Sequence, residues 1–476
     1  MAGIGFELKK IFKKGGIVNT VKGAFYASMT TIGPLVMIIV SLLVMYIFLD
    51  YADLSFAQRD LMASTMLYAF IFSLLLTSPF NSVLSRYIAD KIYESKLQDI
   101  MPSYYVGLSL NIGLAGIVGI PFCLREYFVG GIDPFYILAS YVMFVALMIS
   151  FFNMTYISAV KDYKKISIAF LIGMGIALLL AFFLVKGMGI GLDEAIIYSF
   201  AVGFTIIATI LYAIIRAFFT ENSRNYREPL SYFGKFKGLF FVNLFYTLGL
   251  YSHNFIYWQK EGLRVVVADC FVSAPIYDLA TCIAMFINIS TMVIFVVQVE
   301  TDFHDRYALY CEAVIGGTHR DIMLRKGEML DTMQYKLSFI FQFQFLINVI
   351  LYLMSIILLP GLGISGPVIE MLPSLTVGYF AVFIMYCVIV FLYYFEDTKG
   401  ALLTSFSFLA VTAAGSVLGI LLEVEPGLYG TGLFLGGVIG FTIGYFRIRK
   451  VEKNLEEHIF CRGSILPGRQ RKRKRQ

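Results

Sequence analysis

Long apolar stretches alternate with short polar segments over nearly the whole chain. A hydrocarbon core about 30 Å thick needs about 20 apolar residues in a helix to cross it. Read with a window of that length, the sequence predicts spanning helices at Phe25–Leu49, Leu61–Leu84, Val106–Cys123, Phe135–Val160, Ile166–Val185, Ala195–Phe218, Leu239–Trp258, Ile276–Gln298, Leu337–Leu359, Met371–Phe395, Ala401–Leu422 and Leu428–Phe446. The pattern therefore predicts an all-α polytopic membrane protein with twelve transmembrane helices.

The composition excludes the soluble classes of protein. Of the 476 residues, 59% are hydrophobic and 15% are charged, whereas a soluble globular protein carries about 25% charged residues. A chain with 45 Phe and 31 Tyr residues is also too apolar to remain disordered in water.

The distribution of positive charge predicts the orientation. If the N-terminus is cytoplasmic, all but five of the 38 Lys and Arg residues fall in cytoplasmic segments, as the positive-inside rule requires. Adding or removing one span would move the later basic loops to the opposite side of the membrane and destroy this asymmetry. We therefore expect both the N-terminus and the C-terminus in the cytoplasm.

The spans group into two lobes of six helices, a layout typical of transporters built from structural repeats. Residues 1–24 form a basic amphipathic segment expected on the membrane surface, and spans 1–6 occupy residues 25–219. An inter-lobe linker covers 220–238, and spans 7–12 occupy 239–446 with a cytoplasmic loop at 299–336. The basic tail, 447–476, is expected to contact membrane lipids rather than nucleic acid.

The familiar enzyme signatures are missing from the sequence. It contains no P-loop, GxSxG, HExxH or GxGxxG string, so the sequence predicts a transporter and not an enzyme. The six Cys residues lack metal-ligand spacing, and neither a cofactor nor a metal is expected. Cys123 and Cys270 are both expected on the outer side, which leaves a disulfide between them open.

Ionisable side chains are costly inside a membrane, so the few within the spans are candidate functional residues. Asp278 is the only acidic residue within an expected span, and His253 is the only His. Both lie toward the outer ends of consecutive spans, which predicts a coupling or cavity pair. The alternative is that both lie close enough to the interface to be hydrated.

Further polar residues occupy corresponding places in the two halves. Asn81 and Asn288 lie in spans 2 and 8, where they either bond neighbouring helices or contact a hydroxyl-rich substrate. Arg86 and Asp90 follow at the cytoplasmic end of span 2, as a snorkelling ion pair or as part of a substrate entrance.

Proline predicts bends in two spans. Pro34 in span 1 and Pro79 in span 2 each remove a helical hydrogen bond, which suits helices that line a path.

Several strings resemble a known family. MAGIGFELKKIF, NSVLSRYIADKIYE, VVADCFVSAPIYDLATCIAMF and VQVETDFHDRYALYCEAVIGG are similar to the PelG family of Pel exopolysaccharide transporters, along essentially the whole chain. The resemblance implies the MOP flippase superfamily fold, with two six-helix lobes around a central cavity similar to that of MATE transporters. Arg86, Asp90, Glu300 and Thr301 lie within matching strings at the cytoplasmic ends of spans 2 and 8.

The resemblance also implies a function and partners. The expected substrate is an N-acetylgalactosamine-rich polymer, moved across the cytoplasmic membrane of a bacterium for a biofilm matrix. A cytoplasmic glycosyltransferase and a cyclic-di-GMP-binding membrane protein are the implied partners. The alternatives are a flippase for a lipid-linked oligosaccharide, a cation-coupled drug extruder and a polytopic glycosyltransferase. The scarcity of Lys and Arg inside the spans counts against pyrophosphate-linked cargo.

Overall fold

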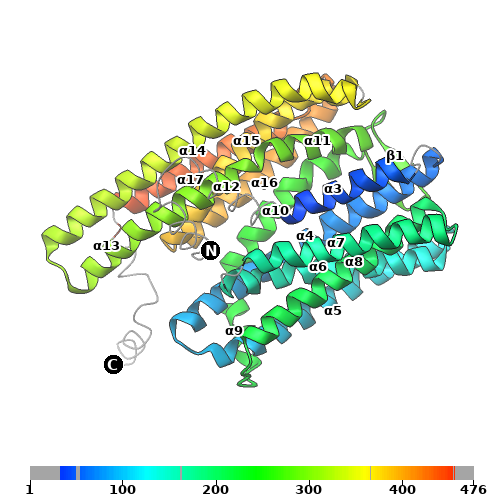
Figure 1. Ribbon diagram of the computed structural model, residues 1–476. Coiled ribbons are helices and arrows are strands. Elements are labelled where there is room, and N and C mark those ends of the chain that lie inside the picture. The colour runs from blue at the N-terminus through cyan, green and yellow to red at the C-terminus, as the bar shows by residue number, and fades with distance from the viewer. Residues whose placement is uncertain (1–32, 50–53, 161–162, 365, 454, 456–476) are drawn as a thin grey trace, which may run out of the picture. The chain divides into compact units, whose positions relative to one another are not determined.

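The computed structural model describes residues 33–49, 54–160, 163–364, 366–453 and 455, and this part of the chain is nearly all helical (Figure 1). The expected amphipathic segment 1–24 lies outside it, as does almost all of the basic tail beyond residue 453.

The chain divides into two compact units. The first contains residues 1–279 and 292–309, and the second contains 280–291 and 310–476. The elements that lie wholly in the first unit are α3 (Gly33–Phe48), α4 (Phe56–Tyr93), the 3₁₀ turn η2 (Leu97–Asp99), α5 (Ile100–Phe128), α6 (Pro134–Val160), α7 (Tyr163–Phe182), the π-helical turn η3 (Phe183–Gly187), α8 (Leu192–Phe218), α9 (Arg227–Lys235), α10 (Lys237–Tyr257), β1 (Val265–Val267) and β2 (Phe271–Ser273).

The boundary between the units passes through the middle of the chain. The elements of this stretch are α11 (Pro275–Asn288), α12 (Ser290–Gln298), the π-helical turn η4 (Val299–Phe303) and α13 (His304–Gly316). The rest of the second unit is built from α14 (His319–Gly361), α15 (Gly366–Tyr394), α16 (Thr398–Leu421), the 3₁₀ turn η5 (Pro426–Leu428) and α17 (Thr431–Lys453).

Ten helical segments among the described residues are long and apolar enough to cross a membrane. They correspond to α4, α5, α6, α7, α8, α11 with α12, α14, α15, α16 and α17. The other two expected spans, the first and the seventh, are helical in their described parts but are not both long and apolar enough to be counted. The expected start of span 1 lies outside the described residues, and α10 carries polar side chains along its 21 residues. The chain is therefore a multi-pass membrane protein, and twelve spans remain a prediction.

Some helices differ from the expected spans in length and continuity. Helix α14 has 43 residues, which at 1.5 Å per residue is about 65 Å and about twice the membrane core. It begins with a capping box in which Thr318 and Asp321 bond each other. The helix then continues without a break from residues 319–336 into the expected span that starts at Leu337. Span 8, expected as one helix, is divided at Ile289 into α11 and α12.

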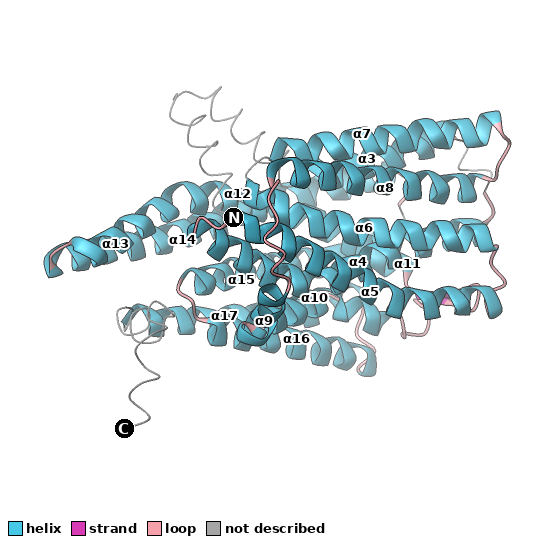
Figure 2. Ribbon diagram, turned by 90° about the horizontal axis from the view of Figure 1, so that it is seen from below, coloured by secondary structure: helices cyan, strands magenta, loops and turns pink. Residues whose placement is uncertain are grey.

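The same helix pairs pack in both units, although no repeat is visible in the sequence. In the first unit α8 packs against α6 and α7, which lie alongside it (Figure 2), and in the second α17 packs against α15 and α16. Counted as spans, these are pairs 4–6 and 5–6 in one unit and pairs 10–12 and 11–12 in the other. The packing is therefore a structural repeat.

Glycine permits the closest of these contacts. A Cβ atom added at Gly203 of α8 would lie 2.9 Å from the carbonyl oxygen of Gly173 in α7, and one added at Gly415 of α16 would lie 2.7 Å from the Cα of Gly432 in α17. Small residues at such positions let membrane helices approach until their backbones touch.

A pair of substitutions in α7 tests this packing. A Cβ at Gly173 would clash with Ile207 and lie 2.7 Å from the Gly203 carbonyl oxygen, whereas one at Gly175 would meet nothing within 4 Å. We expect Gly173→Ala to lower the apparent free energy of unfolding in detergent by about 1–3 kcal/mol and Gly175→Ala to leave it unchanged. Equal melting temperatures for the two variants would contradict the described α7–α8 contact.

Candidate functional site

A hydrogen-bonded cluster joins α10 to the start of α11 within the first unit. Asp278 is buried and accepts hydrogen bonds from Asn254 Nδ2 at 2.7 Å, from Trp258 Nε1 at 3.0 Å and from the backbone nitrogen of Ala274 at 3.1 Å. The last bond lies in the first helical turn, where a carboxylate also compensates the positive end of the helix dipole. The carboxylate therefore fixes α10 and the chain entering α11 in one arrangement.

The second member of the expected pair bonds a different residue. His253 is fully buried, and its Nδ1 lies 2.7 Å from the hydroxyl oxygen of Tyr277. Its position one residue before Asn254, and that of Tyr277 one residue before Asp278, place the two interactions side by side between the same two helices. Each member of the expected pair thus bonds a sequence neighbour of the other member. His253 bonds Tyr277, which precedes Asp278, and Asp278 bonds Asn254, which follows His253, because adjacent residues on a helix point in different directions.

Aromatic rings surround this cluster. The ring of Tyr68 in α4 stacks on Trp258, with 5.3 Å between centroids and 6° between planes, and it meets the edge of Phe271 at 5.1 Å. The Tyr68 hydroxyl also donates to the Val272 carbonyl at 2.8 Å and accepts from the Val272 nitrogen at 3.0 Å. These contacts hold the β1–β2 hairpin against α4.

The hairpin itself is short and tightly turned. Val267 pairs with Phe271 in antiparallel register, and two of the three residues between them, Ala268 and Asp269, have φ of 48° and 51°. Positive φ at two successive turn residues is the geometry that matches the natural twist of two strands. The turn thereby places Phe271 in the core.

The two asparagines that the sequence singles out both bond a helix two spans further along. Asn81 of α4 donates to the Phe151 carbonyl of α6 at 3.3 Å, and Asn288 of α11 donates to the Thr376 carbonyl of α15 at 2.9 Å. Span 2 is thus tied to span 4, and span 8 to span 10. The match is part of the repeat seen in the helix packing.

The network around Asn288 lies within the second unit. Asn348 Nδ2 donates to Asn288 Oδ1 at 2.8 Å, Gln344 Nε2 donates to Asn348 Oδ1 at 2.7 Å, and Ser290 donates to Gln344 Oε1 at 2.8 Å. All four side chains belong to the second unit. The chain of amides lies beside Ile289, where α11 gives way to α12, so it supports the helix break.

Charged residues gather where α4 ends and the inter-lobe linker begins. Arg86 Nε lies 3.1 Å from Asp90 Oδ1, and both side chains are partly exposed. Tyr232 of α9 donates to Asp90 Oδ2 at 3.3 Å. Burial, aided by the Asp90 carboxylate, raises the pKa of Tyr232 to about 12, so its hydroxyl stays protonated and can donate.

A buried lysine that the sequence reading missed completes this charged cluster. The Lys91 side chain is 3% exposed, and its Nζ lies 2.6 Å from Glu228 Oε1, 3.3 Å from Glu94 Oε2 and 3.6 Å from Asp99 Oδ2. Glu228 is in α9, so the lysine binds the linker to the end of α4. The ring of Tyr87, edge-on to Tyr232 at 4.8 Å, covers the cluster.

Pro79 lies inside α4, which continues through it. The hydroxyl of Ser82 donates to the Pro79 carbonyl at 2.9 Å and is also 3.1 Å from the Leu239 carbonyl of α10. Ser78 and Thr247 join the same two helices, with 2.7 Å between their hydroxyl oxygens. Hydroxyl groups around the proline therefore tie α4 to α10.

The remaining candidates are only partly described. Pro34 falls in the first turn of α3, and Glu300 and Thr301 fall in η4, but their side chains are outside the described residues. The disulfide left open by the sequence does not form, because Cys123 and Cys270 are both free and Cys270 Sγ donates to the Arg125 carbonyl at 3.3 Å.

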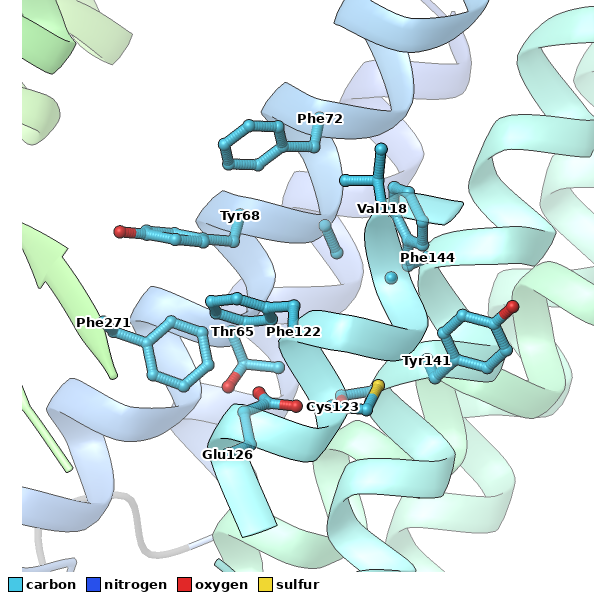
Figure 3. A pocket seen from close by; sticks show the side chains of 13 residues that line it. Thr65, Tyr68, Phe72, Val118, Phe122, Cys123, Glu126, Tyr141, Phe144 and Phe271 are labelled. Carbon is cyan, nitrogen blue, oxygen red and sulfur yellow. The ribbon is translucent and has the colours of Figure 1, made fainter. Parts of the chain in front are cut away.

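Glu126 is a second acidic residue that the sequence reading placed outside the spans. The third span was expected to end at Cys123, but α5 continues to Phe128, so Asp278 is not alone. Glu126 is 2% exposed and points from α5 into a cavity of about 160 Å³ beside Thr65, Phe122 and Phe271 (Figure 3). A cluster of three or more His, Cys, Asp or Glu side chains fit to hold a metal is not found in the part of the chain that the structure covers.

Comparison with known proteins places the chain among membrane transporters. The family model PelG, an "exopolysaccharide Exporter (EPS-E)", matches residues 1–460. No curated protein matches the sequence.

Solved structures of low sequence identity share the fold. An outward-facing MATE multidrug transporter of the MOP superfamily has a TM-score of 0.65 and 12% identity, covering 92% of this chain and 97% of its own. The Vibrio cholerae MATE transporter VcmN in its bent form has a TM-score of 0.61 and 14% identity, covering 96% and 99%. A MOP superfamily transporter from Pyrococcus furiosus has a TM-score of 0.63 and 13% identity, covering 91% and 96%.

Removing the buried lysine should release the linker. Lys91→Met leaves three carboxylates close together without their shared cation, so we expect the free energy of unfolding to fall by about 1–3 kcal/mol. The loss is smaller than for a fully buried ion pair because the carboxylates are partly exposed to solvent. Trypsin should then cut faster within α9. Lys96→Met is the matched control, since Lys96 is 54% exposed and lies 3.0 Å from Glu94. Unchanged cleavage in Lys91→Met would contradict this arrangement.

Trp258, the only Trp of the chain, reports on the Asp278 cluster. Asp278→Asn replaces an acceptor oxygen by an NH₂ group that must face a donor and removes the negative charge beside the indole N–H, so we expect the emission maximum of Trp258 to shift. The free energy of unfolding should fall by about 1.5–3 kcal/mol. Asp60→Asn makes the same chemical change at a half-exposed position in α4 and should leave the spectrum unchanged. An unchanged spectrum in Asp278→Asn would show that the indole does not bond this carboxylate.

Proposed function

We propose that this chain, which belongs to the PelG family of exopolysaccharide exporters, carries a Pel-type, N-acetylgalactosamine-rich polymer across the cytoplasmic membrane of a bacterium, for a biofilm matrix. The observation that carries the proposal is the family match over residues 1–460. The transporter fold supports it, because it is shared over more than nine-tenths of the chain.

The placement of charge favours a glycan over a pyrophosphate-linked lipid. A pyrophosphate group needs Lys or Arg side chains that face it inside the membrane. Lys91, which is buried, is already bonded by three carboxylates. Arg447 of α17 is bonded by Asp397, whose side chain is buried. In both cases the protein itself neutralises the cation, so neither of these two side chains is left to bind a phosphate.

The polar residues of the two units suit separate roles in this transport. Asn81, Arg86 and Asp90 along α4, with Glu300 in the second half of the chain, are proposed to contact the polymer along its path and at its entrance. Amide side chains both donate and accept, as hydroxyl-rich sugars require. Asn288 is fully buried and both ends of its amide are bonded, so we assign it to holding its neighbouring helices together.

Coupling and assembly form the second part of the proposal. His253 and Asp278 lie in adjacent hydrogen-bond pairs between α10 and α11, and we assign them to coupling or to the cavity wall. The charged cluster at α9 and the helices of residues 299–336 are proposed to face a cytoplasmic glycosyltransferase and a cyclic-di-GMP-binding membrane partner. Replacing residues 299–336 should then reduce recovery of the glycosyltransferase with the purified protein.

Cells that lack this protein but retain the polymer synthase provide the test. We expect polymer to disappear from the medium and to accumulate or stop growing inside the cell, because the membrane blocks a hydrophilic chain. Export should return with the wild-type chain. Export that persists without the protein would contradict the proposal, and accumulation of a lipid-linked oligosaccharide instead of polymer would favour a flippase.

The same cells test the coupling residues. His253→Ala combined with Asp278→Ala should abolish export while the protein remains at its wild-type level, and Asp60→Asn is the control. Normal export by the double variant would remove both residues from the coupling role without touching the export function itself.

A further inference from the structure

Glu126 is a buried acid for which the described residues provide no cationic partner. None of their Lys or Arg side chains forms an ion pair with it, although only 2% of the residue is exposed. The neighbouring Arg125 turns away, toward the Asp269 carbonyl at 3.3 Å. A carboxylate that has left water for such a place is costly unless something positive meets it.

The space in front of the carboxylate is large enough for a molecule. The cavity of about 160 Å³ lies between α4, α5, α6 and the hairpin, and an engineered apolar cavity of about 150 Å³ binds benzene. Rings line most of it, including those of Tyr68, Phe72, Phe122, Tyr141, Phe144 and Phe271 (Figure 3). A space of this size fits one six-membered ring with a small substituent.

The wall chemistry is that of an amine site. Aromatic faces attract cations, more strongly when the cation is removed from water, and the carboxylate supplies a charged acceptor for an N–H donor. A bare metal ion would need several oxygen ligands. Glu126 is the only carboxylate among the described residues that line the cavity, so the wall does not supply such a ligand set.

We propose that this cavity binds a protonated organic amine on a frame about one ring in size, with Glu126 holding the ammonium group and the aromatic rings enclosing the frame. The amine comes either from an amino sugar or from a small apolar amine. The site lies wholly within the first unit, and the proposal goes beyond polysaccharide export and does not depend on it.

The structure supplies a reporter for binding. Tyr68 forms one wall of the cavity and its ring also stacks on Trp258. A ligand that presses on the Tyr68 ring changes the surroundings of the indole. Trp258 fluorescence therefore follows occupancy of the cavity without a label.

The experiment titrates the purified full chain in lipid nanodiscs with three probes, followed by Trp258 fluorescence and by calorimetry. Cyclohexylamine has the charge on an apolar ring, glucosamine has it on a hydroxylated ring, and N-acetylglucosamine has the ring without the charge. We expect at least one amine to bind and N-acetylglucosamine not to bind. The stronger of the two amines identifies the source of the ligand. Binding of N-acetylglucosamine alone, or of none of the probes, would overturn the proposal.

Substitutions separate the site from a general effect on the protein. Glu126→Gln keeps the shape and removes the charge, and we expect it to weaken amine binding by roughly tenfold or more, as the loss of one charge-assisted hydrogen bond implies. The melting temperature should not fall, because an unpaired buried charge has been removed. Glu261→Gln, at an exposed position of the same unit, should bind as the wild type does.

A second substitution guards against misfolding of the first. Glu126→Asp keeps the charge but withdraws it by one methylene group, and it should bind the amine more weakly than the wild type and more tightly than Glu126→Gln. Equal amine affinity in the wild type, Glu126→Gln and Glu126→Asp would show that the amine binds elsewhere.

Discussion

Each polar side chain that enters the apolar interior must find its partner inside the protein, because a membrane offers no water to replace it. Asp278 gathers three donors from α10 and the chain before α11, and Asn288 begins a relay of amides that ends at Ser290. Lys91 collects three carboxylates. These bonds join segments far apart in sequence, so the same constraint that limits polar residues also fixes which helices meet.

The repeat between the two units follows from the same constraint. An asparagine in span 2 and one in span 8 each bond the backbone two spans further along, and glycines bring spans 5 and 6, and 11 and 12, to backbone contact. Packing and hydrogen bonding therefore repeat where the sequence does not. One acidic residue departs from this pattern. Glu126 is buried beside a cavity, and no Lys or Arg among the described residues forms an ion pair with it, so a ligand is expected there rather than another helix.

The apolar stretches predicted the helices well because length and hydropathy are local properties of the chain. They did not locate the start of α14, which runs back through residues 319–336 because the polar residues there also favour helix and join the apolar ones without a break. Glu126 was missed because α5 extends beyond its apolar window. Asp278 and His253 were found from their rarity, but their partners Asn254, Trp258 and Tyr277 could be assigned only once the helices were placed.

The central claim is that this chain itself provides the path for a glycan through the membrane. The most direct measurement is the release of a fluorescent N-acetylgalactosamine oligosaccharide from sealed liposomes that contain the purified protein. The account predicts release faster than from liposomes without protein, and loss of that excess in the His253→Ala and Asp278→Ala double variant. Release at the same rate with and without the protein would contradict it.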